Sequence, residues 1–153
     1  MRLVPAALAA LALAAPADAA TFYVVSRTPQ AWTLVDPATV EMTPGGVRRI
    51  ASVTVQKSIT PKGPPQPGYL RSVSEYDCAQ RRTRWLRFTL YSSAGRTVMS
   101  QQNAQPAWTQ PSRGTEGGAI LALLCGDPGG HDQPVISAPS VGDLIVSLFA
   151  SWN

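Results

Sequence analysis

The sequence has little of the chemistry on which most enzymes depend. His131 is the only histidine among 153 residues, and it lies in a glycine-rich stretch next to Asp132. The Gly-x-Ser-x-Gly nucleophile motif, the His-Glu-x-x-His zinc motif and the phosphate-binding loop are all absent. A serine-histidine-aspartate triad would have to use His131, and a metal site would have to combine it with Asp127 and Asp132. A histidine on such a loop is a weak signal for either site, so we expect no enzyme, no metal and no cofactor.

Charged side chains are also scarce, at 14% of the chain, with a net charge of +4. Glu75 and Asp77 are two residues apart, so on a strand they would share a face about 7 Å apart. Such a pair is conceivable in a glycosidase. We instead expect Asp77 to pair with an arginine across a hairpin, as opposite charges on neighbouring strands do.

No apolar run reaches the roughly 20 residues that a membrane-spanning helix needs. The N-terminus has Arg2 as a basic head, then an Ala/Leu run, then Ala17-Asp18-Ala19, which is the three-part pattern of a secretory signal peptide. We expect residues 1–19 to be removed and the protein to be periplasmic or secreted. No cysteine for a lipid anchor lies near this cleavage point. Export argues against nucleic acid as a partner and favours an acidic protein surface, anionic polysaccharide or acidic lipid headgroups.

Only two cysteines are present, Cys78 and Cys125. In an exported chain an even number of cysteines favours a disulfide, and two cysteines allow one pairing. Closing a loop of this length would stabilise the fold by roughly 4 kcal/mol. The alternative is that Cys78 is a thiolate nucleophile activated by neighbouring arginines.

Proline and glycine are abundant, with 14 and 12 residues, which favours short strands joined by turns. In 50–58, Ala51, Val53 and Val55 alternate with polar residues, so we expect one buried face. The proline-rich segment 61–68 is expected to be an exposed loop. The predicted strands lie in 21–26, 31–40, 50–58, 69–78, 82–91 and 97–101. They predict an α+β fold built on an antiparallel meander of about six strands.

Two helices are predicted after the strands. The first, 115–125, has Glu116 at its start and would present Cys125 at its last turn, although Gly117 and Gly118 weaken it. The second, 140–152, has Ser140 and Asp143 at capping-box spacing. Its apolar stripe either docks on the sheet or binds a partner or membrane surface. The stripe consists of Val141, Leu144, Ile145, Leu148, Phe149 and Trp152.

These elements predict a simple organisation of the chain. Residues 1–19 form the signal peptide, 20–127 the α+β domain, 128–139 a turn-rich linker and 140–153 the C-terminal amphipathic helix.

Four arginines occur within seven residues of the strand predicted over 82–91 and the turn before it. In one interpretation Arg81, Arg82, Arg84 and Arg87 form salt bridges at the hairpin end. In the other, Trp85, Arg87 and Tyr91 share a strand face and form a basic-aromatic patch that binds an acidic partner.

Three stretches carry a family resemblance. They are "WTLVDPATVEMTPGGVRRIASVTVQKS", "SVSEYDCAQRRTRWLRFTLYSSAGRTV" and "QPAWTQPSRGTEGGAILALLC". In this order the sequence resembles the surface-adhesin protein E family of exported bacterial proteins over about residues 31–126. The resemblance implies an antiparallel sheet packed by a helix, with the two matching cysteines bridged.

The same resemblance implies a noncatalytic binding module, because the family takes its name from binding host extracellular-matrix and serum proteins. The alternative is a periplasmic structural or inhibitor module without a host ligand. The sequence departs from the family in lacking the lipid-accepting cysteine of an anchored adhesin and in adding the segment after Gly126.

Overall fold

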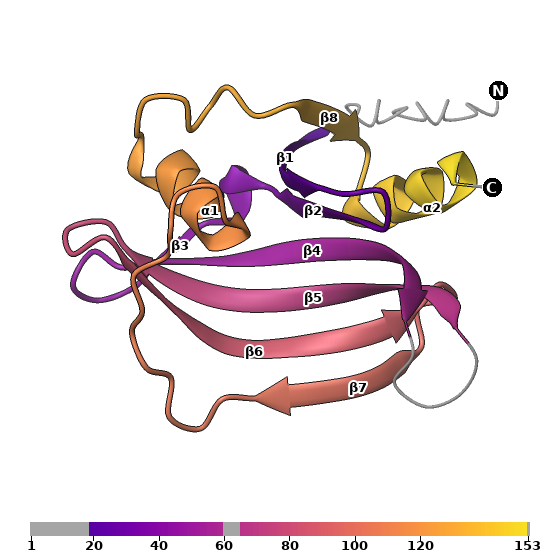
Figure 1. Cartoon of the computed structure of the whole chain (residues 1–153), viewed down its shortest axis with the longest axis horizontal. Helices are drawn as coiled ribbons and strands as arrows, with labels where there is room; N and C mark the ends of the chain where they lie inside the picture. Colours follow the sequence, from indigo (N-terminus) through magenta and orange to yellow (C-terminus); the bar gives the residue numbers. More distant parts are fainter. Residues whose placement is uncertain (1–18, 60–64, 153) are drawn as a thin grey trace, which may run out of the picture.

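The computed structural model describes residues 19–59 and 65–152, and it has eight strands and two α-helices (Figure 1). The predicted antiparallel α+β class is confirmed, but the sheet has more than the six strands expected. Residues 1–18 of the predicted signal peptide lie outside the described residues. The strands are β1 Ala20–Arg27, β2 Ala31–Val35, β3 Glu41–Met42, β4 Arg48–Ile59, β5 Gln66–Asp77, β6 Arg82–Ser92, β7 Thr97–Gln102 and β8 Val135–Ala138. The helices are η1 Pro37–Thr39, α1 Glu116–Cys125 and α2 Val141–Ser151.

All strand pairs are antiparallel, in the order β7-β6-β5-β4-β2-β1-β8, with β3 beside the start of β4. Two parts of this sheet correct the sequence prediction. Gln66 to Gly68, expected in the proline-rich loop, begin β5 and pair with β4. Strand β8 lies in the segment predicted as a linker and pairs with β1, with Tyr23 opposite Val135. The four residues of β8 lie between Pro134 and Pro139 and have every backbone donor that a strand needs.

The part of the sheet formed by β1, β2 and β4 is buried on both faces. Val53 and Val55 contact the cluster under α2, as the alternating pattern of β4 predicts. Ile50 and Ser52 on the opposite face are buried as well, so the prediction of a single buried face for this strand is wrong. The cause is α1, whose Ile120 packs with Ile50 and completes a second cluster.

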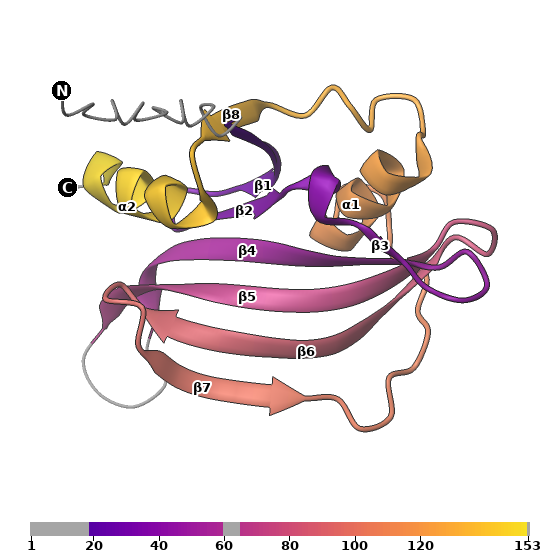
Figure 2. The ribbon, with the colours of Figure 1, turned by 180° about the vertical axis from the view of Figure 1, so that it is seen from behind.

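The two helices therefore lie on opposite faces of the same strands. The α2 side contains Phe22, Val24, Leu34, Val53, Val55, Leu144, Ile145 and Leu148. The α1 side contains Val25, Val35, Ile50, Tyr76, Ile120, Leu121, Leu123 and Leu124. In both views the helices lie near β1 and β2, while β7 is at the far edge of the sheet (Figures 1 and 2). The sheet from β5 to β7 is consequently the part that helices cover least.

Side-chain caps start both α-helices, and a glycine ends α1. The Thr115 hydroxyl accepts a hydrogen bond from the Gly118 N–H at 3.2 Å, and Gly126 ends α1 in the left-handed region at φ 70°. The Ser140 hydroxyl accepts from the Asp143 N–H at 3.1 Å and starts α2. Leu144, Ile145 and Leu148 of α2 are buried against the strands, so this helix docks on the sheet, but Val141 at the start of the predicted stripe is exposed. Neither α-helix of the described ranges has the length and apolar character needed to cross a membrane.

A disulfide joins Cys78, just after β5, to Cys125 at the end of α1, with 5.5 Å between their Cα atoms. This confirms the predicted pairing and leaves no free thiol for a nucleophile. Arg81, in the turn after Cys78, forms a two-point ion pair with Asp127, just after α1. The β5–β6 turn is thus attached to the end of α1 twice.

Candidate functional site

Some arginines of the β5–β6 hairpin form ion pairs with carboxylates of the described residues, and others do not. Three of the four that the sequence singles out form salt bridges at the hairpin end, as the first interpretation expects. The pairs are Arg81 with Asp127, Arg82 Nε with Asp77 Oδ2 at 3.0 Å, and Arg84 Nη2 with Glu75 Oε2 at 2.6 Å. Arg82 and Arg84 also lie over the Trp108 ring, at 4.5 and 4.4 Å from its centre. These three arginines belong to the framework of the hairpin.

Glu75 is the centre of this framework, and its side chain is 3% exposed. Burial raises the pKa of Glu75, but hydrogen bonds and charges from Arg49 and Arg84 outweigh it and hold the pKa below its ordinary value. A backbone N–H in the turn and Arg82 lower the pKa of Asp77 against the effect of its desolvation. A glycosidase acid needs a raised pKa to keep its proton at neutral pH. The two carboxylates do not fit that role, and Asp77 pairs with an arginine as predicted.

Arg87 differs from the other three arginines. Its side chain is exposed, and no carboxylate of residues 19–59 or 65–152 lies within 4.0 Å of its guanidinium. Arg87 is opposite Val73 in the β5–β6 pairing, and Tyr91 is opposite Tyr69. The two tyrosine rings stack with their centres 4.8 Å apart. Arg87 and Tyr91 therefore lie on the same face of the sheet, as predicted.

Trp85 lies on the other face. Val73 pairs with Arg87, but the next residue, Ser74, pairs with Trp85, so Leu86 is an extra residue in a β-bulge. The Trp85 ring packs against Phe88, with ring centres 5.6 Å apart. The prediction that Trp85, Arg87 and Tyr91 share one face is wrong in this respect. A single inserted residue inverts the alternation, and nothing in the strand pattern marks it.

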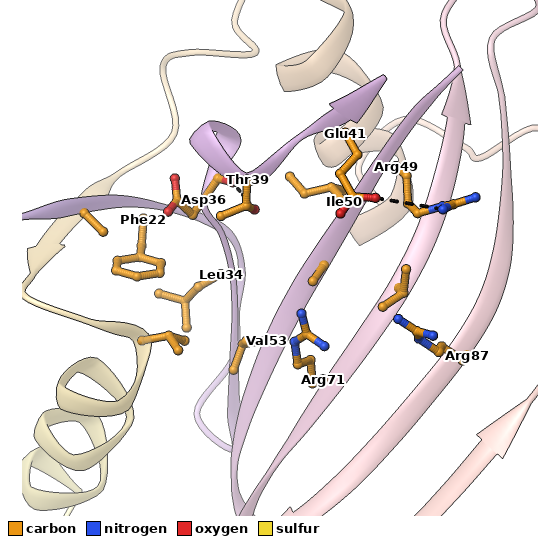
Figure 3. Close-up of a pocket in the computed structure, with 14 residues that line it drawn as sticks. Phe22, Leu34, Asp36, Thr39, Glu41, Arg49, Ile50, Val53, Arg71 and Arg87 are labelled. Atoms are coloured by element: carbon orange, nitrogen blue, oxygen red, sulfur yellow. Dashed lines mark hydrogen bonds and ion pairs between the residues drawn. The ribbon is translucent and has the colours of Figure 1, made fainter. Parts of the chain in front are cut away.

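The face that carries Arg87 is hollowed by a groove with a volume of about 370 Å³ (Figure 3). Its floor is apolar and comes from four strands: Phe22, Leu34, Ala51, Val53 and Val73. Arg71 and Arg87 line one side, while Asp36 and Glu41 line the other together with Arg49, which lies 3.8 Å from Glu41. Val141, at the start of α2, forms part of the wall. The groove thus has an apolar floor between a side with two arginines and a side with two carboxylates and Arg49.

Arg71 is a site residue that sequence reasoning missed. It is opposite Thr89 in the β5–β6 pairing, so it lies diagonally from Arg87, about 7–8 Å away across the strands. Like Arg87 it is exposed and has no carboxylate within ion-pair distance among the residues that the structure describes. The sequence could have indicated Arg71, because it alternates with Tyr69 and Val73 along one strand and therefore shares their face.

The remaining candidates from the sequence are occupied by other contacts. His131 packs edge-on against Tyr23 with ring centres 6.0 Å apart, and Asp127 is paired with Arg81. Within the described ranges, no three metal-binding side chains gather in one place.

Comparisons with known proteins bear on the β-sheet and α1. The family model described as surface-adhesin protein E matches residues 22–126, which is more than half of the chain. No curated protein and no solved structure matches the chain. Helix α2 lies beyond the matched residues, although its leucines are buried in the same molecule. The chain belongs to the surface-adhesin protein E family.

Proposed function

We propose that this protein is an exported, noncatalytic binding module whose partner is an acidic protein surface outside the cytoplasmic membrane. Its contact surface is the face of β5 and β6 on the α2 side of the sheet, hereafter the arginine–tyrosine face, which consists of Tyr69, Arg71, Arg87 and Tyr91. Membership of an adhesin family supports export and binding rather than catalysis.

One observation carries this proposal: among the residues that the structure describes, Arg87 has no ion-pair partner, whereas the three arginines before it have one. An exposed guanidinium with free donors can form paired, charge-assisted hydrogen bonds with a carboxylate of another protein. The neighbouring Tyr91 supplies flat contact area that loses little conformational entropy on binding. The carboxylates that catalysis would need, Glu75 and Asp77, are already committed to salt bridges.

The test is a binding screen of the purified chain against immobilised extracellular-matrix and serum proteins, followed by Arg87→Ala and Tyr91→Ala. Each substitution should weaken binding to the partner found by about 1–3 kcal/mol. Raising the salt concentration from about 0.05 M to about 0.3 M should also weaken binding, because exposed charges are screened.

Two controls make this test specific. Trp85→Ala changes a large side chain on the opposite face of the same strand and should leave the affinity unchanged. Thermal unfolding of each variant checks that the fold is intact. A partner that tolerates Arg87→Ala and Tyr91→Ala but not Trp85→Ala would move the contact surface to the other face. Protease digestion of whole cells should degrade the protein if it is displayed at the surface, and a protected protein would favour a periplasmic module.

A further inference from the structure

The groove beside the arginine–tyrosine face has a distribution of charge that selects among acidic ligands. Arg71 and Arg87 present two guanidinium groups from neighbouring strands at one side of it (Figure 3). Two converging guanidinium groups fit a single carboxylate whose two oxygens each accept hydrogen bonds.

The floor of the groove is apolar, so it suits an apolar part of a ligand. Leu34 is 1% exposed and Phe22 is 5% exposed, and both lie where α2 and the sheet meet. Val73, at 6% exposed, continues this surface toward Arg87. Because these floor residues are already nearly buried, the apolar area that leaves the water when an aliphatic side chain lies here belongs mainly to the ligand.

The far side of the groove argues against a simple alkyl chain. The Asp36 and Glu41 side chains lie there with Arg49, across the groove from Arg71 and Arg87 in Figure 3. Asp36 Oδ1 already accepts a hydrogen bond from the Ala38 N–H, which leaves its other oxygen for a ligand. Glu41 is held only loosely, 3.8 Å from Arg49, and its side chain is 72% exposed. Carboxylates accept hydrogen bonds from amide N–H groups, whereas an alkyl chain placed against them would strip their water without replacing it.

We infer that the groove binds the carboxyl-terminal residue of a partner polypeptide. Its α-carboxylate lies between Arg71 and Arg87, its aliphatic side chain covers the floor at the neighbouring Ala51 and Val73, and its preceding backbone N–H groups face Asp36 and Glu41. The inference rests on the proposed function, because it names what the arginine–tyrosine face recognises. It is narrower, because it commits the groove to one kind of carboxylate, that of a chain terminus.

The experiment measures binding of the N-acetylated peptide Gly-Ser-Gly-Val-Leu to the purified chain by titration calorimetry or backbone-amide NMR. The free acid should bind, and the same peptide with an amidated carboxyl terminus should bind at least about tenfold more weakly, since it loses the charge. Arg71→Gln and Arg87→Gln should each weaken the free acid by about tenfold. The matched control Arg96→Gln, an exposed arginine in the β6–β7 turn, should change it less than about twofold.

Four results would overturn the inference, and three of them concern the peptide itself or decanoate. They are no binding of the free acid at millimolar concentration, equal binding of acid and amide, and tighter binding of decanoate than of the peptide, which would indicate a fatty-acid site. An amidated peptide with an internal glutamate that binds as well as the free acid would also exclude the carboxyl-terminal mode. The proposed function is tested separately, because a partner from the protein screen can still depend on Arg87 when every one of these peptides fails.

Discussion

Arginine serves two purposes on β5 and β6, and the presence of a facing carboxylate decides which. Arg84 is directly opposite Glu75 in the strand pairing, so its charge is neutralised inside the fold. Arg87 is opposite Val73 and Arg71 is opposite Thr89, so neither meets a carboxylate across the ladder. The residues opposite Arg84 and Arg87 are only two positions apart on β5, yet the first arginine is part of the framework and the second is available for binding.

Substitution of Glu75 tests how much one buried carboxylate stabilises the fold. Glu75→Gln keeps the shape but removes the charge that Arg49 and Arg84 hold at 2.6 Å each, so the free energy of unfolding at pH 7 should fall by about 2 kcal/mol. The folded pKa is lowered, so the stabilisation is present above the ordinary glutamate pKa and is lost as the pH falls through the folded value. Urea unfolding between about pH 7 and pH 3 should show a shallower loss in the variant than in the parent chain.

Glu41→Gln is the matched control for this series. Glu41 contacts the same Arg49 but is largely exposed, so its substitution should change the unfolding free energy by less than about 0.5 kcal/mol. If the two variants lose the same stability, the buried cluster around Glu75 is not what holds the hairpin end.

Most elements were predictable because their signals are local. The alternation in β4 and β6 and the Ser140–Asp143 cap of α2 all depend on residues close together in the chain. The bulge at Leu86 was not predictable, since it adds one residue without changing the composition of the strand. Strand β8 was missed because four residues between two prolines give too little pattern to detect.

Gly118 of α1 is another residue whose role cannot be read from the local sequence pattern. Gly118 counts against a helix by propensity, yet a Cβ built there would lie 2.3 Å from the Ser112 carbonyl oxygen. The residue permits the segment before α1 to approach the helix, and no local pattern reveals that contact.

This close approach predicts opposite signs for two similar substitutions. Gly118→Ala should lower the free energy of unfolding by about 1–3 kcal/mol, although alanine is the better helix former, because the backbone must move apart. Gly142→Ala in α2 meets only the Ser140 hydroxyl oxygen at 3.5 Å, so it should raise stability by about 0.5 kcal/mol. Chemical denaturation of both variants measures the difference. Stabilisation by Gly118→Ala would mean that the Ser112 segment is free to shift.

At the scale of the whole molecule, the groove is a product of topology. Its floor combines residues of β1, β2, β4 and β5, and its basic side comes from β5 and β6. Val141 of α2 contributes from beyond the residues that the family model matches. Sequence reasoning found Arg87 because it lies in a dense arginine run, but it could not place Arg87 on the same groove as Phe22, which is 65 residues away in the sequence.

The disulfide between the end of β5 and the end of α1 should contribute to the stability of the whole fold. Cys78 and Cys125 are 47 residues apart, so reduction lets the unfolded chain explore many more conformations. The double variant Cys78→Ala/Cys125→Ala should lower the free energy of unfolding by about 2–4 kcal/mol in urea. Dithiothreitol should lower the stability of the parent chain by a similar amount and leave the double variant unchanged. The parent chain, denatured without reductant, should titrate no thiol. The Arg81–Asp127 pair still joins the turn to the end of α1 in the variant, but exposed ion pairs contribute too little to replace the covalent link. Equal stability of parent and double variant would show that packing of α1 against the sheet is sufficient without it.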